Sequence, residues 1–484
     1  MFHPWLNSIL PAATHPAHIA FDSSRTSAQP FAVPEILFSK KLFAMHPTRR
    51  QFLQTTATAS LAFSAAPFVR AAEPGRKLRT ALIGCGWWGK NILKEGMASG
   101  RAKVVALADV DGHALEVAAE QVTDLSGDQP KTYRDYRELL AKEKPEVVII
   151  STPDHWHALQ AIDAVKAGAH VFVEKPTGHS VNESRAMVAA ARATGRTVQV
   201  GLHRRIGPHH VSAMRFLREG HVGKVGMVRL FVHYGGGTEL PKPNSKAPAN
   251  MDWDLWCGPA PLRPFNTKLH PGGWRQFLDY GNGQLGDWGV HWLDQVMLWS
   301  DEKSPRRVYS TGGRDIAGAA VLNDREQTTD APDHQVAVYD FEGFTVSWEH
   351  RKFAANNAEK HNVGAYFYGT KGTLHIGWRD GWSFYPADGK EKAVHVNSEL
   401  QEPDGHNLKL LYADFLAAID SGRKPVADIE SAHRSSVLPM LGMMSLKLGR
   451  SLNWDGTKEQ IIGDPEANAL LTRKYRGPWE YPKA

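Results

Sequence analysis

Residues 80–89 read Thr-Ala-Leu-Ile-Gly-Cys-Gly-Trp-Trp-Gly, and after a helix-like run residues 103–109 read Lys-Val-Val-Ala-Leu-Ala-Asp. A short apolar strand therefore runs directly into a glycine-rich turn, and a second apolar strand ends in Asp109. The order of strand, glycine turn, helix and strand is typical of a dinucleotide-binding βαβ unit. The alternative is a plain glycine turn in an α/β sheet.

The three glycines have separate tasks in such a unit. Gly84 lets the chain turn sharply, Gly86 lets the backbone approach a pyrophosphate, and Gly89 lets the helix pack closely on the strand. Asp109 lies 20 residues after Gly89, where an acid meets the ribose hydroxyls and would repel a 2′-phosphate. The sequence therefore predicts NAD rather than NADP. The residues of this unit expected to bind it are Gly84, Gly86, Trp87, Trp88, Gly89 and Asp109.

The charge of the chain gives no reason to expect a nucleic-acid partner. The net charge is +6, but residues 1–72 hold six basic and two acidic residues, so the remainder carries only +2. The composition, 42% hydrophobic and 22% charged over 484 residues, is that of a globular protein with two ordinary domains. No apolar stretch beyond residue 72 is long enough to cross a bilayer. The two cysteines, Cys85 and Cys257, are expected to be unpaired.

The N-terminal region resembles an export signal. Thr48-Arg49-Arg50-Gln51-Phe52-Leu53 carries a twin arginine, a modest apolar run follows, and Val69-Arg70-Ala71-Ala72 offers a small-residue cleavage site. We predict a Tat signal peptide over 45–72 and an exported, periplasmic protein that uses the Tat machinery. A basic N-terminal helix that stays in place is the alternative to this signal peptide. Residues 1–44 are interpreted as a mis-assigned leader. Because no NAD pool lies outside the cytoplasmic membrane, the cofactor should be bound before export and retained.

Strands and helices alternate along the next part of the chain. Apolar strands are expected at 146–151, 169–174 and 197–201, with helices at 112–122, 135–142, 155–167 and 180–193. This alternation predicts a doubly wound parallel sheet, a Rossmann domain over 77–201.

After residue 225 the pattern changes. Long aromatic and β-branched runs at 225–234, 335–341, 344–349 and 364–370 favour a predominantly antiparallel sheet. We therefore predict an α/β protein in which an α+β C-terminal domain for substrate and oligomerisation (202–405) follows the Rossmann domain. C-terminal helices that pack back (406–455) and a tail (456–484) complete the chain. The irregular segment 235–285 is long enough to be functional, and Trp253, Trp256 and Trp274 in it either face a sugar or pack as core.

Two short motifs follow strands of the expected parallel sheet, at the edge where such sheets bind ligands. Ser151-Thr-Pro-Asp-His-Trp-His157 places Thr152, Pro153 and His157 there, although Asp154 would also suit the N-cap of an ordinary strand-to-helix turn. Glu174-Lys175-Pro176 follows the next strand, and a cis bond before Pro176 would fix the direction of the lysine. A surface lysine before a turn is the alternative. We expect Thr152, Pro153, His157, Glu174 and Lys175 to contribute to cofactor binding.

A third motif suggests proton transfer. Asp287 and His291 are i, i+4 neighbours on one face if their segment is helical. An acid beside an imidazole raises the pKa of the imidazole and orients its ring. Two ligands are too few for a metal site, so we predict none. His203, Arg204 and Arg205 could contact an acidic sugar or line the domain boundary, and the sequence leaves this open.

Together these motifs resemble the glucose–fructose oxidoreductase and inositol dehydrogenase (Gfo/Idh/MocA) family, most closely its exported bacterial branch. The resemblance spans residues 77–455. It rests on the glycine turn, Thr152-Pro153, Glu174-Lys175-Pro176, Trp253-Asp-Leu-Trp-Cys-Gly-Pro-Ala-Pro261, Asp287-x-x-x-His291, Tyr368-Gly-Thr-Lys-Gly372 and Gly422-Arg-Lys-Pro-x-Ala-Asp428.

The resemblance implies the catalytic roles. His291 would take the proton of a substrate hydroxyl, Lys175 would stabilise the developing alkoxide, and Asp287 would hold the tautomer. It implies an NAD-dependent oxidoreductase acting on the CH–OH group of a sugar, polyol or derivative, paired as a homo-oligomer through the open face of the second sheet. His203, Arg204 and Arg205 gain no role from it.

Two other functions remain open. A redox-assisted glycoside hydrolase, lyase or epimerase would use retained NAD transiently, although its known hydrolase branch has a Tyr-Pro-Thr-His-type run where this chain has Gly286–His291. A non-catalytic binding protein is the third reading. The intact set of Lys175, Asp287 and His291 argues against it.

Overall fold

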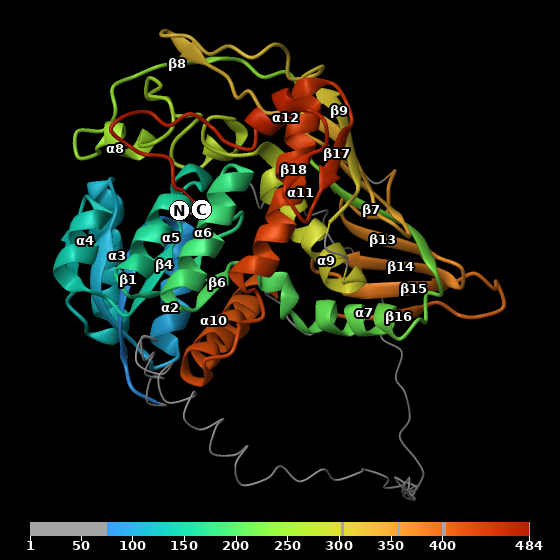
Figure 1. Cartoon of the computed structure of the whole chain (residues 1–484), viewed down its shortest axis with the longest axis horizontal. Helices are drawn as coiled ribbons and strands as arrows, with labels where there is room; N and C mark the ends of the chain where they lie inside the picture. The colour runs from blue at the N-terminus through green and yellow to red at the C-terminus, as the bar shows by residue number, and fades with distance from the viewer. Residues whose placement is uncertain (1–74, 302–303, 357, 399–402, 484) are drawn as a thin grey trace, which may run out of the picture. The chain divides into compact units, whose positions relative to one another are not determined.

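The first half of the structure is a parallel sheet with helices on both faces, as predicted (Figure 1). The computed structural model describes residues 75–301, 304–356, 358–398 and 403–483, so the predicted leader and signal peptide lie outside the described residues. Six parallel strands follow the order β3-β2-β1-β4-β5-β6. They are β1 (Leu78–Ile83), β2 (Ala102–Ala108), β3 (Lys131–Tyr133), β4 (Val147–Ile150), β5 (His170–Val173) and β6 (Val198–Val200).

Helices lie between successive strands where the apolar periodicity indicates them. They are α2 (Trp87–Ala98), α3 (Gly112–Ser126), α4 (Tyr136–Glu143), α5 (Asp154–Lys166) and α6 (Val181–Thr194). All four residues of β4 are buried, because helices cover both faces of a sheet of this kind. The exposed strand β3 was not predicted, since its three residues carry no apolar run.

The second half is built on a ten-stranded mixed sheet, ordered β16-β15-β14-β13-β7-β12-β11-β9-β17-β18. Its neighbouring strands run antiparallel except for β7 and β12, which confirms the predominantly antiparallel prediction. The strands are β7 (Val225–His233), β9 (Arg307–Gly313), β11 (His334–Asp340), β12 (Thr345–Arg351), β13 (Val363–Gly369), β14 (Gly372–Gly377), β15 (Trp382–Pro386), β16 (Val394–Val396), β17 (Leu452–Asp455) and β18 (Gln460–Ile461). A separate two-stranded sheet pairs β8 (Lys242–Pro243) with β10 (Glu326–Gln327).

One face of the ten-stranded sheet is covered by helices. Apolar side chains of α7 (Pro208–Arg218), α9 (Val290–Ser300) and α11 (Ile429–Leu448) pack with buried strand residues into one core. The register places Met227, Tyr309 and Val336 together on the opposite face, each more than two-fifths exposed. The sheet is therefore buried on one side and open on the other.

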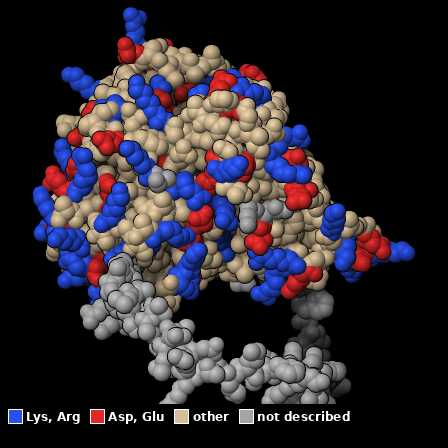
Figure 2. Space-filling view, in the orientation of Figure 1, with Lys and Arg blue, Asp and Glu red and all other residues tan. Residues whose placement is uncertain are grey.

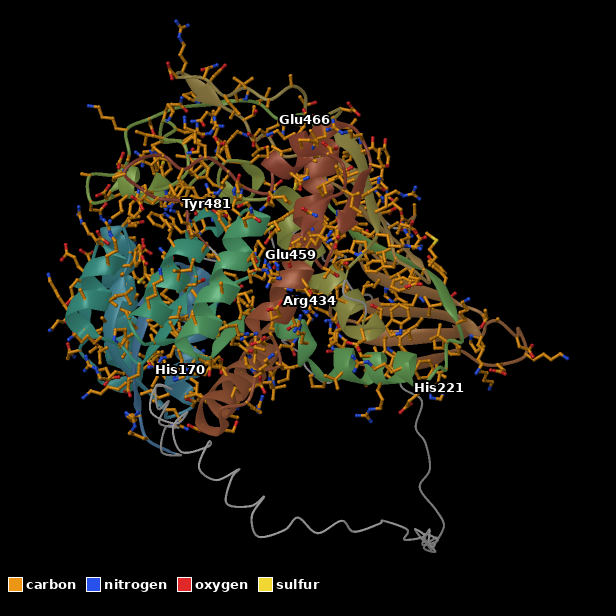
Figure 3. The ribbon with its side chains drawn as sticks, in the orientation of Figure 1. His170, His221, Arg434, Glu459, Glu466 and Tyr481 are labelled. Carbon is orange, nitrogen blue, oxygen red and sulfur yellow. The ribbon has the colours of Figure 1, made fainter. Side chains whose placement is uncertain are left out.

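The C-terminal part of the chain returns to the Rossmann domain. Helix α10 (Pro403–Ser421) adds Tyr412 and Phe415 to the core of that domain, where both rings pack against Phe172. After the short helix α12 (Pro465–Ala469), the tail packs beside α6, where the hydroxyls of Tyr481 and Ser180 lie 2.8 Å apart (Figure 3).

The Trp-rich segment forms a third, small core around helix α8 (Trp253–Cys257). Trp253 and Trp256 stack with ring centroids 4.5 Å apart, and Trp256 and Trp274 are 6% and 8% exposed. Of the two readings left open for these tryptophans, the structure favours core packing.

Arg205 lies at the boundary of the two domains, so the structure favours the second of the two roles left open for it. Its Nε lies 3.0 and 2.9 Å from the two carboxylate oxygens of Asp294 on α9, and it also donates to the Val426 carbonyl and the Ser431 hydroxyl. The Arg205 and Asp294 side chains are 5% and 1% exposed. The boundary is therefore fixed by a fully buried ion pair.

The cysteines, the helices and the surface charge add three further observations. Cys85 and Cys257 are buried free thiols, as expected. Among the described residues, no helix combines the length and apolar character needed to cross a membrane. Basic and acidic side chains are interspersed over the face drawn in Figure 2, in keeping with the small net charge after residue 72.

Replacing Asp294 with alanine should lower the free energy of unfolding by about 3–5 kcal/mol, because the Arg205 guanidinium would stay buried without its counter-ion. Urea unfolding followed by tryptophan fluorescence measures this loss. Asp340→Ala is the matched control, since Asp340 pairs with the exposed Arg306 and Arg307 and should cost at most about 1 kcal/mol. Similar losses in the two variants would contradict the special role of the buried pair.

Candidate functional site

The glycine turn has the geometry that a dinucleotide needs. Gly84 has a φ of +92°, and a Cβ there would lie 2.6 Å from the Ser151 carbonyl oxygen. A Cβ on Gly89 would lie 2.1 Å from the Gly84 oxygen, so both positions require glycine. A Cβ on Gly86 would meet nothing within 4 Å. The space above Gly86, at the N-terminus of α2, is therefore open to a phosphate group.

Asp109 holds this turn in place. One of its carboxylate oxygens accepts the Cys85 N–H at 2.7 Å, and the other accepts the Asp111 N–H at 2.9 Å. Burial raises the pKa of Asp109 to about 6. Each carboxylate oxygen has a second lone pair, so the predicted contact with ribose hydroxyls is compatible with the hydrogen bonds from the Cys85 and Asp111 N–H groups.

The two tryptophans of the turn differ in setting. Trp87 is 56% exposed, and its ring centroid lies 5.2 Å from that of Trp88. The Trp88 indole donates a hydrogen bond to the buried carboxyl of Glu174, whose pKa is raised by burial. A Cβ on Gly201 would lie 2.2 Å from a Glu174 oxygen, so this glycine leaves room for the acid. Glu174 is therefore linked through Trp88 to the first turn of α2.

His157 connects the two motifs at the edge of the sheet. Its Nδ1 lies 2.8 Å from the Pro176 carbonyl oxygen and its Nε2 2.8 Å from that of Thr152. Burial lowers the pKa of His157 to about 4. Because both ring nitrogens face backbone carbonyls, His157 positions the Thr152-Pro153 and Lys175-Pro176 turns. Its contact with the cofactor stays a prediction.

Asp154 is not the helix cap that its sequence position suggested. Helix α5 begins at Asp154 with Pro153 as N-cap, and no side-chain cap hydrogen bond forms. The carboxyl accepts the Asn282 N–H and faces Lys175, Arg275 and Asp287. Burial raises its pKa from 3.8 to about 8. Asp154 is therefore a protonated acid at the edge of the site, which sequence reasoning missed.

Lys175 reaches across to the second domain. Its Nζ lies 2.6 Å from an Asp287 carboxylate oxygen and donates to the Asp287 carbonyl at 2.9 Å. The lysine and the acid are 14% and 21% exposed, which excludes the surface-lysine alternative. The bond before Pro176 is cis, as expected. Arg275 also donates to Asp287 at 3.2 Å, so one carboxylate joins two cations.

The predicted partnership between Asp287 and His291 is wrong. Residues Leu285–Gly289 form a π-helical turn before α9, so the α-helical i, i+4 geometry does not apply. The Asp287 carboxylate turns to Lys175 and Arg275, which outweigh burial and leave its pKa below the usual value. Burial, and then the charge of Lys175, hold the pKa of His291 well below its usual value instead of raising it.

His291 lies in an aromatic setting. Its ring centroid is 5.1 Å from that of His203 and 5.4 Å from that of Trp378, and its Nδ1 is buried without a hydrogen-bond partner among the described residues. The Arg204 guanidinium lies 3.3 Å from the Trp378 ring centroid and pairs with Asp404. The His203 ring thus contacts His291 directly, whereas the Arg204 guanidinium packs on the Trp378 ring.

Sequence reasoning missed Arg275, Trp378 and Asp404 as well as Asp154. Arg275, Trp378 and Asp404 stand in no motif that indicates a ligand. Asp154 stands inside the Ser151–His157 motif, but its position there suggests a helix cap. The structure brings the predicted trio together only in part. Lys175 and Asp287 are in direct contact, while His291 is linked to Lys175 only through the charge of the lysine, which lowers the pKa of His291.

Two family profiles match this chain. The NAD-binding Rossmann fold of an oxidoreductase family matches residues 78–202, and the C-terminal alpha/beta domain of that family matches residues 221–481. The second match alone covers more than half of the 484 residues. The chain belongs to the Gfo/Idh/MocA oxidoreductase family. This confirms the predicted family, the fold class and the NAD-binding Rossmann domain.

Similar proteins carry several different activities. A glycosyl hydrolase family 109 protein of Saccharopolyspora erythraea is 26% identical over 310 residues, 59% of this chain and 62% of that protein, so the match spans less than two thirds of the relative. A levoglucosan dehydrogenase in complex with NADH and levoglucosan aligns with a TM-score of 0.60 at 20% identity, over 78% of this chain and 99% of that one. An aldose-aldose oxidoreductase from Caulobacter crescentus complexed with glycerol aligns with a TM-score of 0.57 at 19% identity, over 78% and 100%. At these identities the solved structures share the fold.

Gly86→Ala should weaken NAD binding at least tenfold while the fold persists, because the added methyl group would fill the space that a pyrophosphate needs. Alanine caps helices less well than glycine, so a stability loss of about 1 kcal/mol is expected as well. Calorimetric titration with NAD measures the affinity. Gly343→Ala is the control, since a Cβ there also meets nothing within 4 Å. Unchanged NAD affinity in Gly86→Ala would contradict the proposal that a phosphate group occupies the space above Gly86.

Asp154→Asn should remove a pH-dependent loss of stability. Between the usual pKa of 3.8 and the raised value of about 8, only the unfolded chain releases this proton. The free energy of unfolding of the wild type should therefore fall relative to the variant as pH rises from about 5 to about 8, and the difference should then level off. Thermal unfolding across this range measures it. The exposed Asp388 gives a control, Asp388→Asn, whose difference from the wild type should stay constant.

Proposed function

We propose that this chain is an NAD-dependent oxidoreductase that transfers hydride between retained NAD and a hydroxyl-bearing carbon of a sugar, polyol or derivative. The observation that carries the proposal is the contact of Lys175, from the edge of the NAD-binding sheet, with Asp287 of the second domain beside the buried His291. The sugar and polyol ligands of the structurally similar proteins support the substrate class.

The residues divide the reaction between them. A neutral imidazole can accept a proton, so His291 takes the proton of the substrate hydroxyl. An ammonium group has three N–H donors; Lys175 gives two to Asp287 oxygens, and the third is directed to the developing alkoxide. Asp287 and Arg275 hold Lys175 in position. When bound, oxidised NAD accepts the hydride that leaves the carbon.

Export belongs to the same proposal. The twin-arginine segment supports a Tat-exported, periplasmic protein that carries its cofactor through the membrane already folded. Retained NAD must then return to its starting redox state in each cycle or through a second substrate. A homo-oligomer through the open sheet face is also proposed, supported by the exposed Met227, Tyr309 and Val336 on that face.

A redox-assisted hydrolase, lyase or epimerase is the second candidate. The similarity to a glycosyl hydrolase family 109 protein favours it. In such a reaction, oxidation of a ring hydroxyl acidifies the neighbouring C–H, and the hydride returns after cleavage or inversion. The protonated carboxyl of Asp154 would suit protonation of a leaving group.

The test begins with protein purified from its export route without added cofactor. Absorbance in the reduced-nicotinamide band is followed through a panel of sugars and glycosides, and the products are analysed. Bound nucleotide that one sugar reduces and a second compound reoxidises would establish the oxidoreductase. Cleaved or inverted product without net redox change would establish the second candidate. If the bound nucleotide keeps its redox state and the sugars are unaltered, the chain is a non-catalytic binding protein. Protein purified without any bound nucleotide would contradict the proposal that NAD is retained.

His291→Ala should lower the rate of nicotinamide reduction by about 10²–10⁴-fold, because a positioned general base contributes about that factor. The bound NAD should remain, since the glycine turn is untouched. His221→Ala is the control, an exposed histidine just beyond α7 (Figure 3), and should reduce NAD at the wild-type rate. An unimpaired His291→Ala variant would defeat the assignment of this base.

A further inference from the structure

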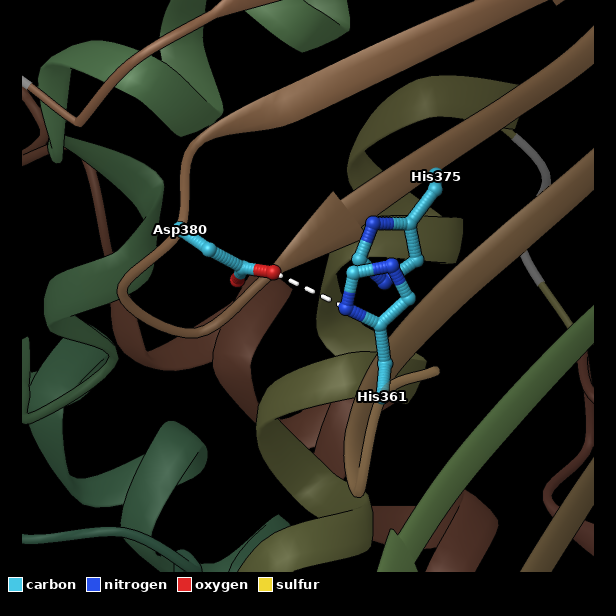
Figure 4. Close-up of side chains that lie close together, drawn as sticks. All are labelled: His361, His375 and Asp380. Carbon is cyan, nitrogen blue, oxygen red and sulfur yellow. Dashed lines mark ion pairs between the residues drawn. The ribbon is translucent and has the colours of Figure 1, made fainter. Parts of the chain in front are cut away.

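Two histidines and one aspartate lie together in the ten-stranded sheet, apart from the Lys175–Asp287 pair. His361 stands just before β13, His375 lies on β14, and Asp380 lies in the turn between β14 and β15 (Figure 4). Each offers one ligand atom, and the three atoms lie within 4.8 Å of one another. We call these residues the β14 cluster.

The nitrogens of the β14 cluster are poorly satisfied by the protein. His361 Nδ1 lies 2.9 Å from an Asp380 carboxylate oxygen. The Nε2 atoms of His361 and His375 are both buried and have no hydrogen-bond partner among the described residues. The two rings stack face to face, with centroids 3.7 Å apart and planes 18° from parallel. Two imidazole nitrogens of this cluster are therefore buried without a hydrogen-bond partner, which is unfavourable without a ligand.

Two glycines make room for this arrangement. A Cβ on Gly364 would lie 2.8 Å from His375 Nε2, and a Cβ on Gly377 would lie 1.6 Å from an Asp380 oxygen. A side chain at either position would push against a cluster residue. The Asp380 side chain is half exposed, so one edge of the β14 cluster is open to solvent.

A second group with similar residue types differs in one respect. His233, Glu349 and Glu359 also lie within ligand distance of one another. Arg229 donates to both of these carboxylates, and Arg351 donates to Glu359. Their charge is thus already neutralised. None of the described arginines or lysines forms an ion pair with Asp380, so the β14 cluster keeps its carboxylate for another cation.

We propose that His361, His375 and Asp380 bind a divalent transition-metal ion, with zinc as the expected occupant. Two imidazole nitrogens and one carboxylate oxygen are a ligand set that zinc accepts, with a water in the fourth position. Imidazole together with carboxylate excludes a preference for magnesium or calcium, which take oxygen ligands. Binding requires each ring to turn about its Cβ–Cγ bond, which replaces the stacking contact with a bond to the ion.

The location gives the ion a task. The turn that carries Asp380 also carries Trp378, whose ring contacts His291 and Arg204. An ion bound to the β14 cluster would tie this turn to His361 and His375. It would therefore fix the position of the Trp378 ring beside His291 without contacting the reacting groups.

Zinc titration of the tag-free mature protein, first dialysed against a chelator, tests the proposal by calorimetry. We expect one zinc ion per chain. Asp380→Asn should weaken binding at least tenfold, and His375→Ala should abolish it. His395→Ala is the matched control, because His395 lies on β16, which pairs with β15, and is hydrogen-bonded to Ser383 and Asn397. It should bind zinc like the wild type. The half-exposed Asp380 keeps the test informative if His375→Ala does not fold.

Hydrogen exchange locates the ion independently of any catalytic activity. Zinc should slow exchange of the backbone amides of residues 372–386, and Asp380→Asn should lose that protection. Failure to bind zinc, equal affinity in Asp380→Asn and wild type, or protection elsewhere in the chain would each overturn the proposal.

Discussion

The buried ion pair between Arg205 and Asp294 is the constraint on which the site depends. Arg205 follows the last strand of the Rossmann sheet, and Asp294 lies on α9, one turn beyond His291. Removing either charge from water is costly unless the partner and further hydrogen bonds are in place. The Ser435 hydroxyl also donates to Asp294, which brings α11 into the same junction. Helix α9 is thereby held at one orientation against the nucleotide-binding domain.

That orientation determines the charge balance of the site. Lys175 and Arg275 share the single carboxylate of Asp287, while burial keeps Asp154 protonated below pH about 8. Lys175 and Arg275 are therefore two cations on the one carboxylate that they share. A surplus positive charge in a partly dehydrated site stabilises a developing alkoxide. Burial, with the charge of Lys175 added to it, lowers the pKa of His291, so the imidazole is neutral and able to accept a proton.

The sequence was most informative where structure is local. The glycine turn, the buried strand 147–150 and the helices after it follow from residues within one βαβ unit, so periodicity and turn chemistry predict them. The short edge strand β3 was not predicted because it carries no apolar run. The partner of Asp287 could not be read from spacing, since a π-helical turn changes which residues face one another. Asp154 looked like a cap because Arg275, Asn282 and Asp287, which interact with its carboxyl, lie more than a hundred residues away.

The tryptophans show why residue type alone does not define a sugar site. Trp253, Trp256 and Tyr280 pack against one another in the third core, so their faces are already covered. Trp378 stood in no recognisable motif, yet its ring lies against His291 and under the Arg204 guanidinium. An indole face covered by a cation on one side can present only its remaining surface to a substrate. The aromatic contribution to specificity should therefore come from the β14–β15 turn rather than from the Trp-rich segment, and its precision depends on how firmly that turn is anchored.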